Sequence, residues 1–199
     1  MNRLCVVFLA ALAFTTGAAR ADWVPGDSVK RALDSGAAWS EVKPSTQGAN
    51  EIRAAVDIDA SPKTVWTVMN DCKVAPRIIA TLTRCEIVEG DMQKGWDVRE
   101  QVTRGNLFVP TLRNRVRGDY EPYRHIRFHR VGGDLRIEEG EWRLEPLKGG
   151  AATRLFYRNR VAVAVLAPAF IVREGLKRDT AKVMTNLRRE CLLAKAAAP

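Results

Sequence analysis

The sequence predicts an α+β fold in which a curved antiparallel β-sheet is closed by one long C-terminal helix. Apolar residues alternate over 51–58, and within three residues the spacing becomes helical after Ser61 and Pro62. Several alternating segments separated by turn residues follow, and one long amphipathic helix ends the chain. A sheet that curls around a single helix encloses an interior. This order of elements therefore favours binding of a ligand inside the protein.

Residues 1–21 have the features of a secretory signal peptide, with a basic start, an apolar run over 4–14, and the small residues Ala19 and Ala21. A transmembrane anchor is the alternative, but about 11 apolar residues are fewer than the roughly 20 that span a bilayer. Cleavage before Asp22 would remove two basic residues and no acid, which lowers the formal net charge from +9 to +7. We therefore expect a periplasmic or secreted protein with one folded domain.

Residues 22–50 form an N-terminal lead-in, in which a short helix near 29–33 and a strand over 38–43 are expected. The main domain is predicted over residues 51–195, with a second short helix over 72–80 interrupted by Pro76. Glycine-rich and proline-containing turns then separate consecutive strands, which is typical of an antiparallel meander. These strands are expected at residues 84–89, 95–103, 110–120, 125–131, 135–144 and 153–165.

Three cysteines remain after processing. Cys72 and Cys85 are 13 residues apart, and in an oxidising compartment they either form a disulfide or stay reduced, because geometry decides between the two. Cys191 falls on the apolar side of the last helix and is expected to be an inert core thiol. No cluster of cysteine and histidine has the spacing of zinc ligands, so we expect neither a metal site nor a cofactor.

The last helix is predicted over residues 168–195. One stripe of this helix is mainly apolar, and it must pack on the concave face of the sheet because no other apolar surface is large enough. The stripe contains Phe170, Val172, Leu176, Thr180, Val183, Leu187 and Cys191. Basic residues occupy the opposite side of the helix.

Alternation along each strand assigns its residues to the two faces of the sheet, with the apolar set placed inside. Arginines then gather on the outer face together with His125 and His129, either as a solvated surface or as a contact for anionic lipid headgroups. Glu100 and Glu138 are expected inside, where a carboxylate needs a wet opening, an arginine or a polar ligand. The inward set contains Trp96, Val98, Glu100, Val102, Asn114, Tyr120, Phe128, Glu138, Trp142, Tyr157 and Asn159.

Three segments are distinctive: DIDASPKTVWTVMND at 57–71, GGDLRIEEGEWRLEPL at 132–147 and LAPAFIVREGLKRD at 166–179. They resemble the START-like or SRPBCC superfamily, in particular its polyketide cyclase/dehydrase and coenzyme Q-binding branch. The resemblance implies a helix-grip fold, in which a seven-stranded sheet and the C-terminal helix surround a deep hydrophobic cavity. Carried over by position, the cavity would be lined by Trp66, Trp96, Asn114, Phe128, Trp142, Tyr157, Phe170, Leu176 and Thr180.

The resemblance implies a lipid, sterol, polyketide, quinone or hormone as the ligand, whereas a minority of the superfamily catalyse cyclisation or dehydration. The tryptophans serve core packing or ligand contact, and Asn114, Tyr157 and Asn159 orient a polar headgroup or hold a buried water. We therefore predict an exported carrier or sensor of a hydrophobic molecule. The alternative is a cyclase or dehydratase with Glu138, Glu100 and Tyr157 as acid–base groups. A domain with a filled core is a third reading, and nucleic acid is not expected as a partner.

Overall fold

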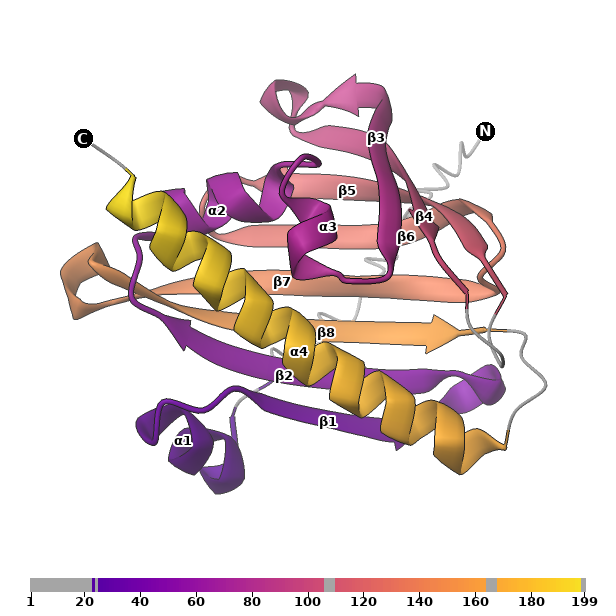
Figure 1. Cartoon of the computed structure of the whole chain (residues 1–199), viewed down its shortest axis with the longest axis horizontal. Helices are drawn as coiled ribbons and strands as arrows, with labels where there is room; N and C mark the ends of the chain where they lie inside the picture. The colour runs from indigo at the N-terminus through magenta and orange to yellow at the C-terminus, as the bar shows by residue number, and fades with distance from the viewer. Residues whose placement is uncertain (1–22, 24, 106–109, 164–167, 198–199) are drawn as a thin grey trace, which may run out of the picture.

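The computed structural model describes residue 23 and residues 25–105, 110–163 and 168–197. Eight antiparallel strands form one sheet in the order β1-β2-β8-β7-β6-β5-β4-β3 (Figure 1), so the strand that opens the main domain lies beside the last one. The strands are β1 Trp39–Pro44, β2 Asn50–Ile58, β3 Leu82–Asp91, β4 Trp96–Thr103, β5 Leu112–Glu121, β6 His125–Gly133, β7 Ile137–Leu147 and β8 Ala152–Ala162.

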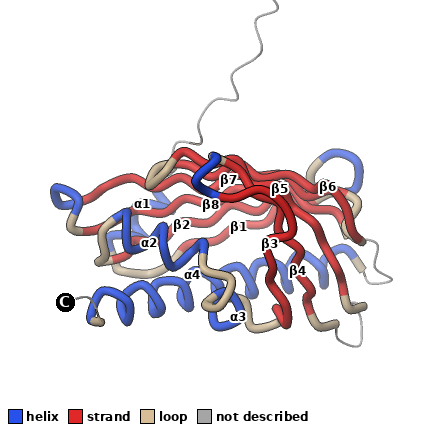
Figure 2. Tube along the Cα trace, turned by 90° about the horizontal axis from the view of Figure 1, so that it is seen from above, coloured by secondary structure: helices blue, strands red, loops and turns tan. Residues whose placement is uncertain are grey.

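In the described part of the chain, four α-helices accompany the sheet, and the longest of them crosses its concave face. Figure 2 shows the sheet arching over this helix, α4, while Figure 1 shows α2 and α3 beside its C-terminal half. The helices are α1 Asp27–Asp34, α2 Pro62–Asn70, α3 Ala75–Ile78 and α4 Ala169–Ala196. This is the predicted helix-grip arrangement, an open curved sheet with two short helices after the first strand of the main domain.

The start of α2 follows from its sequence. Ser61 precedes the helix in an extended conformation, and its Oγ accepts a hydrogen bond of 3.2 Å from the backbone N–H of Thr64. Pro62 occupies the first turn, where its missing N–H costs no helical hydrogen bond. The helix therefore begins where the sequence predicts, and it places the side chains of Trp66 and Asn70 in the interior.

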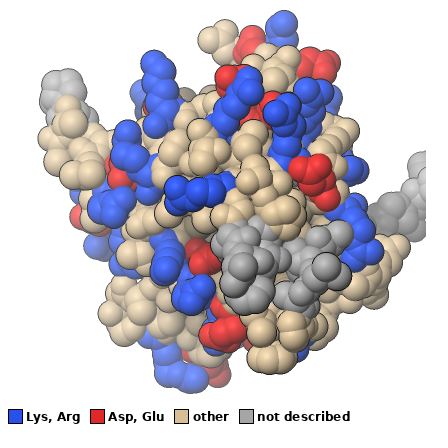
Figure 3. All heavy atoms as spheres, turned by 45° about the vertical axis from the view of Figure 1, so that its right-hand side comes forward, with Lys and Arg blue, Asp and Glu red and all other residues tan. Residues whose placement is uncertain are grey.

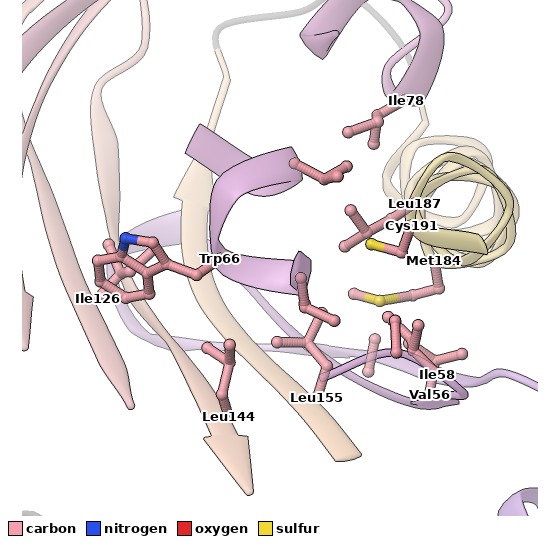
Figure 4. Close-up of a cluster of buried hydrophobic side chains, with 14 residues drawn as sticks. Val56, Ile58, Trp66, Ile78, Ile126, Leu144, Leu155, Met184, Leu187 and Cys191 are labelled. Atoms are coloured by element: carbon pink, nitrogen blue, oxygen red, sulfur yellow. The ribbon is translucent and has the colours of Figure 1, made fainter. Parts of the chain in front are cut away.

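The hydrophobic core lies between the sheet, α2, α3 and the second half of α4 (Figure 4). Val56 and Ile58 from β2 face Met184, Leu187 and Cys191 from α4, and all five side chains are buried. Burial raises the pKa of the Cys191 thiol to about 12, and the neighbouring Glu190 adds to this rise. The prediction that Cys191 is a core residue is therefore confirmed.

The lead-in residues pack on the opposite, convex face of the sheet. Val29 and Leu33 of α1 contact Ala55 of β2 and Phe156 of β8, and the Trp23 and Trp39 rings stack at a centroid distance of 5.5 Å. β1 extends the sheet beyond the seven strands that the resemblance implies, because residues 39–44 pair with β2. The strand and the short helix expected in the lead-in are both present.

The disulfide between Cys72 and Cys85 is formed, with a Cα–Cα distance of 5.2 Å. It joins the loop before α3 to the edge strand β3. The structure thus decides the alternative that the sequence left open, because the chain reversal through α3 brings the two cysteines together. On the outer face, His125 bonds Glu141 at 3.0 Å, consistent with the face predicted for this histidine.

Candidate functional site

A cavity of about 210 Å³ lies between the concave face of the sheet and the helices α3 and α4. Strands β4 to β8 form its floor, and Val183 and Leu187 of α4 cover it together with Ala75, Ile78 and Ile79 around α3. The remaining residues of its wall are Met69, Asn70, Cys85, Asp97, Arg99, Gln101, Val116, Gly118, Tyr120, Ile126, Phe128, Glu138, Trp142 and Tyr157. The cavity therefore has apolar walls interrupted by a few polar side chains, as ligand sites commonly have.

Three aromatic rings form the central part of the floor. The Trp142 and Tyr157 rings lie 4.1 Å apart between centroids, and the Phe128 ring stacks with the Tyr157 ring at a centroid distance of 6.2 Å. Gly140 makes this possible, because a Cβ at that position would lie 2.7 Å from Phe128 Cζ. The aromatic floor offers a broad, flat apolar surface to a ligand.

A buried ion pair lines one part of the cavity. Arg99 Nη2 bonds Asp97 Oδ2 at 2.9 Å, and its Nε lies 3.1 Å from both carboxylate oxygens. The Tyr120 hydroxyl donates to Asp97 Oδ1 at 2.6 Å, and Arg99 also bonds the backbone and side-chain oxygens of Asn70. We call Asn70, Asp97, Arg99 and Tyr120 the paired cluster, since its members satisfy one another.

The strand geometry explains how the paired cluster forms. Asp97 and Arg99 are two residues apart on β4 and so face the same side of the sheet. Gly118 lies opposite Asp97 on β5, and the Tyr120 hydroxyl lies only 2.7 Å from where a Gly118 Cβ would be. The absence of a side chain at Gly118 therefore lets the Tyr120 ring reach Asp97.

Burial dominates the electrostatics of this cluster. Loss of solvent, followed by the neighbouring Asp97, raises the pKa of Tyr120 well above its usual value of 10, although Arg99 opposes the rise. Burial would lower the pKa of Arg99, but the hydrogen bonds to Asp97 raise it instead. At neutral pH the cluster thus contains a neutral phenol and a fixed ion pair.

A second polar group lies on the wall formed by β7 and β8. Glu138 faces the cavity, and within the described residues its Oε2 is buried and has no hydrogen-bond partner. Asn159, which is 5% exposed, lies beside Tyr157 on the inner face of β8, and its Oδ1 is likewise buried without a partner. We call Glu138, Tyr157 and Asn159 the open cluster.

Burial raises the pKa of Glu138 to about 7, and the positive charge of Arg130 on β6 opposes this rise. Burial also raises the pKa of Tyr157, with a further contribution from Glu138, whereas the hydrogen bond to Asn159 acts in the opposite direction. Glu138 therefore exchanges its proton near neutral pH, unlike an ordinary surface carboxylate.

Nine of the eleven predicted site residues fall into three groups. Phe128, Glu138, Trp142 and Tyr157 line the cavity. Trp66 is buried in the core, where it contacts the Tyr120 ring at 5.8 Å, and Asn114 and Asn159 are buried on the inner face of the sheet next to the cavity residues of β5 and β8. Thr180 is buried and Leu176 half-buried on α4, and neither belongs to the cavity wall.

The face predicted for β4 is wrong. Asp97, Arg99 and Gln101 face the cavity, so Trp96 and Glu100 lie on the convex side. Trp96 packs beneath Arg117 at 4.2 Å, and Glu100 bonds Arg115 at 2.9 Å with Arg113 and Arg84 nearby. The prediction failed because it placed the more apolar set inside, whereas here an internal ion pair replaces apolar burial.

Phe170 also differs from its prediction. It lies in the first turn of α4 and is 65% exposed, so it does not line the cavity. The predicted apolar stripe of α4 reaches too far toward the N-terminus of the helix. The residues of α4 that line the cavity are Val183 and Leu187, which lie in its second half.

Sequence reasoning missed the paired cluster as a site. A signal was present, since an aspartate and an arginine spaced two apart on a central strand place opposite charges on one face. Tyr120 was expected to point inward, but its partner could not be found while β4 was assigned the opposite orientation.

Among the residues that the structure describes, no group of three or more histidine, cysteine, aspartate or glutamate side chains could hold a metal ion. In the same part of the chain, every helix is too short or too polar to span a bilayer.

The cavity between sheet and helix defines a helix-grip protein with an internal site. A family model described as "Polyketide cyclase / dehydrase and lipid transport" matches residues 58–188, and the chain belongs to this family. A search of curated proteins gives no match.

Solved structures share the fold at low sequence identity. The aromatase/cyclase Zhui from Streptomyces sp. R1128 has a TM-score of 0.61 and 18% identity over 75% of this chain and 97% of its own. A STAR-related lipid transfer protein from Xanthomonas axonopodis has a TM-score of 0.62 and 13% identity over 77% and 98%. A START superfamily protein from Mycobacterium smegmatis has a TM-score of 0.61 and 16% identity over 72% and 97%.

Proposed function

We propose that the protein is an exported, non-enzymatic carrier or sensor that binds a hydrophobic small molecule, a lipid or an isoprenoid-like compound, between the sheet and α4. The observation that carries this proposal is the cavity of about 210 Å³ with its aromatic floor and aliphatic cover. Membership in a family of cyclases and lipid transport proteins supports it. Binding is driven by removal of apolar surface from water, and a ligand that buries about 200 Å² gains about 5 kcal/mol.

Exchange of the ligand is proposed to occur beside α3. This helix has only four residues, and Ala75, Ile78 and Ile79 in and next to it cover the cavity. A small displacement of so short an element uncovers the aromatic floor, and within the core it moves Ile78 away from its neighbours. The Cys72–Cys85 disulfide limits this displacement, because it ties the chain before α3 to β3.

Export is the second part of the proposal. The basic and apolar character of residues 1–21 supports a signal peptide. The disulfide between Cys72 and Cys85 is consistent with an oxidising compartment such as the periplasm.

Contact with an anionic membrane through outer-face arginines is the third part. Many of these arginines are engaged in ion pairs on the same face, including Arg154 with Asp57 and Arg158 with Glu51. Acidic and basic side chains are also intermixed on the side of the molecule that Figure 3 shows, which is the right-hand side of Figure 1 turned forward. Arg113 and Arg115 are better suited to lipid headgroups, because their side chains are 59% and 52% exposed and both lie near the single carboxylate of Glu100. Vesicles with anionic lipid should sediment more of the wild type than of Arg113→Gln/Arg115→Gln.

A cyclase or dehydratase is the second candidate, and one observation favours it. Glu138 faces the cavity with a pKa of about 7, which suits a general acid or base. Tyr157 lies beside it, whereas Glu100 is no longer part of this hypothesis because it faces outward. In an enzyme, Glu138→Gln should abolish turnover, while in a carrier it should leave the affinity for a purely apolar ligand nearly unchanged.

Native mass spectrometry of the protein purified from the periplasm, followed by solvent extraction, tests the carrier proposal. We expect a bound amphiphile in the wild type and its loss in Val183→Phe, which fills the cavity. Thr185→Phe is the matched control, because Thr185 is exposed on the same helix and should keep the ligand. Wild-type protein without any bound molecule, or equal retention in both variants, would contradict the proposal.

A further inference from the structure

The two acceptor oxygens of the open cluster give information about the ligand. Glu138 Oε2 and Asn159 Oδ1 are both buried, and neither has a donor within the described chain. Most buried polar atoms in folded proteins have a partner, and an acceptor left without one costs free energy. A molecule that brings a donor into the cavity would satisfy such an acceptor.

The surroundings of Glu138 do not supply this donor. Arg130 acts on Glu138 through its charge, but its Nη2 donates to the backbone oxygen of Gly133 at 2.7 Å. The paired cluster is closed as well, because Arg99 is shared between Asp97 and Asn70. On the cavity wall, Glu138 is therefore the acceptor that stands open to a ligand.

The volume limits the size of the ligand. An apolar cavity of about 150 Å³ takes up benzene, so a cavity of about 210 Å³ accommodates a molecule of about ten non-hydrogen atoms. A diacyl phospholipid is far larger than this. The rings of Phe128, Trp142 and Tyr157 favour a ligand that is itself flat or compact and apolar.

On the basis of the proposed function, we propose that the cavity binds a small alcohol or phenol of about ten non-hydrogen atoms. The hydroxyl group of this ligand donates a hydrogen bond to Glu138 Oε2, and its apolar body lies on the aromatic floor. A hydroxyl group suits this site because it supplies a donor at small volume and without net charge. A carboxylate ligand suits it poorly, because its charge would face that of Glu138.

Three probes that differ in the hydrogen-bond donor test this inference. 4-Propylphenol carries the hydroxyl, 4-propylanisole replaces it with a methoxy group, and propylbenzene has neither. Calorimetric titration at pH 8 should give a dissociation constant for the anisole about tenfold higher than that for the phenol, as expected for a hydrogen bond to a charged acceptor. Propylbenzene tests the apolar cavity alone, and its binding is the requirement of the carrier proposal.

Two variants assign the preference to Glu138. Glu138→Met removes the acceptor while keeping the length of the side chain, and the ratio of anisole to phenol dissociation constants should fall toward one. Glu139→Met is the matched control, since Glu139 is the next residue and pairs with Arg160 on the outer face, so the ratio should stay as in the wild type.

The outcomes separate the two proposals. Equal affinities for phenol and anisole in the wild type, with propylbenzene bound, overturn the assignment of the hydroxyl group and leave the carrier proposal standing. A preference for the phenol over the anisole that persists in Glu138→Met also overturns this assignment, because the phenol hydroxyl would then donate to a group other than Glu138. Failure of all three probes to bind overturns the inference together with the carrier proposal for ligands of this size.

Discussion

The paired and open clusters lie at the same cavity but differ in whether their carboxylate oxygens have hydrogen-bond partners within the protein. Asp97, Arg99 and Tyr120 bond one another, and the Asp97 side chain is fully buried. Glu138 has the same kind of carboxylate at the same cavity, yet its Oε2 is without a partner in the described structure. A closed network fixes the shape of the wall, whereas an unmet acceptor is a place for a ligand. Burial alone therefore does not distinguish a structural carboxylate from a binding one.

The largest effect of a single substitution is expected in the paired cluster. Asp97→Asn leaves the buried Arg99 guanidinium without its counter-charge and should lower the free energy of unfolding by about 3 to 5 kcal/mol. Urea denaturation of the two proteins measures this difference.

Asp97→Leu/Arg99→Met is the control, because it removes both charges together. Replacement of a complete ion pair by apolar side chains is often nearly neutral. The double variant should therefore recover part of the loss, and the remainder reflects the Tyr120 hydroxyl and the Asn70 oxygens, which lose their partners. If the double variant were as unstable as Asp97→Asn, the unpaired charge of Arg99 would not be the cause of the loss in stability.

Much of the fold could be predicted from the sequence because its signals are local. Alternation along β2, the Ser61 and Pro62 start of α2, and the glycine-containing turns each depend on neighbouring residues. The stripe on α4 predicts its position against the sheet, and Val183, Leu187 and Cys191 do pack inward.

The candidate site was harder to predict because it depends on partners that are distant in the sequence. The orientation of β4 depends on Arg99 meeting Asn70, 29 residues earlier, and on Tyr120 meeting Asp97, 23 residues apart. Hydrophobicity favours Trp96 and Val98 inside and therefore gives the wrong face. Strands β7 and β8 contribute no inward ion pair like that of Asp97 and Arg99 to the cavity wall. On these strands alternation correctly places Glu138, Trp142 and Tyr157 on the cavity side.

The disulfide lies at the wall that carries the paired cluster, since Cys85 and Asp97 both line the cavity. Cys72→Ser/Cys85→Ser should lower the free energy of unfolding by about 3 kcal/mol, because closing a loop of roughly this length restricts the unfolded chain by that amount. Chemical denaturation measures the loss, and Cys191→Ser cannot serve as a control because Cys191 is fully buried. Wild-type protein under reducing conditions provides the control and should match the double variant.

A smaller effect of opposite sign is expected in the open cluster. At pH 8, Glu138→Gln should be more stable than the wild type by about 2 kcal/mol, because the substitution removes a buried charge that has no hydrogen-bonding partner at its Oε2. Thermal or urea unfolding at pH 8 and pH 5 measures this difference.

The pH dependence follows from the raised pKa of Glu138. In the folded protein it is about 7, above its usual 4.5, so between these values the folded state holds a proton that the unfolded chain has released. Stability of the wild type therefore falls as the pH rises through this window, and the advantage of Glu138→Gln should shrink toward pH 5. Arg130, Tyr157, Asp97, Arg99 and Tyr120 are the other charged or titratable groups around this cavity, and all are present in both proteins. An advantage that is the same at pH 5 and pH 8 would contradict a buried, titrating Glu138.

The smallest expected effects come from removing one tyrosine hydroxyl from each cluster. Tyr120→Phe removes a hydrogen bond of 2.6 Å to the Asp97 carboxylate and should cost about 1.5 kcal/mol, as for a bond to a charged acceptor. Tyr157→Phe removes a buried hydroxyl group that interacts with the neutral Asn159 side chain and should cost about 0.5 kcal/mol. Because both variants lose the same hydroxyl group from the same cavity, urea denaturation of the two measures the difference between a closed and an open network. A cost for Tyr157→Phe equal to or above that for Tyr120→Phe would mean that the open cluster is as tightly bonded as the paired one.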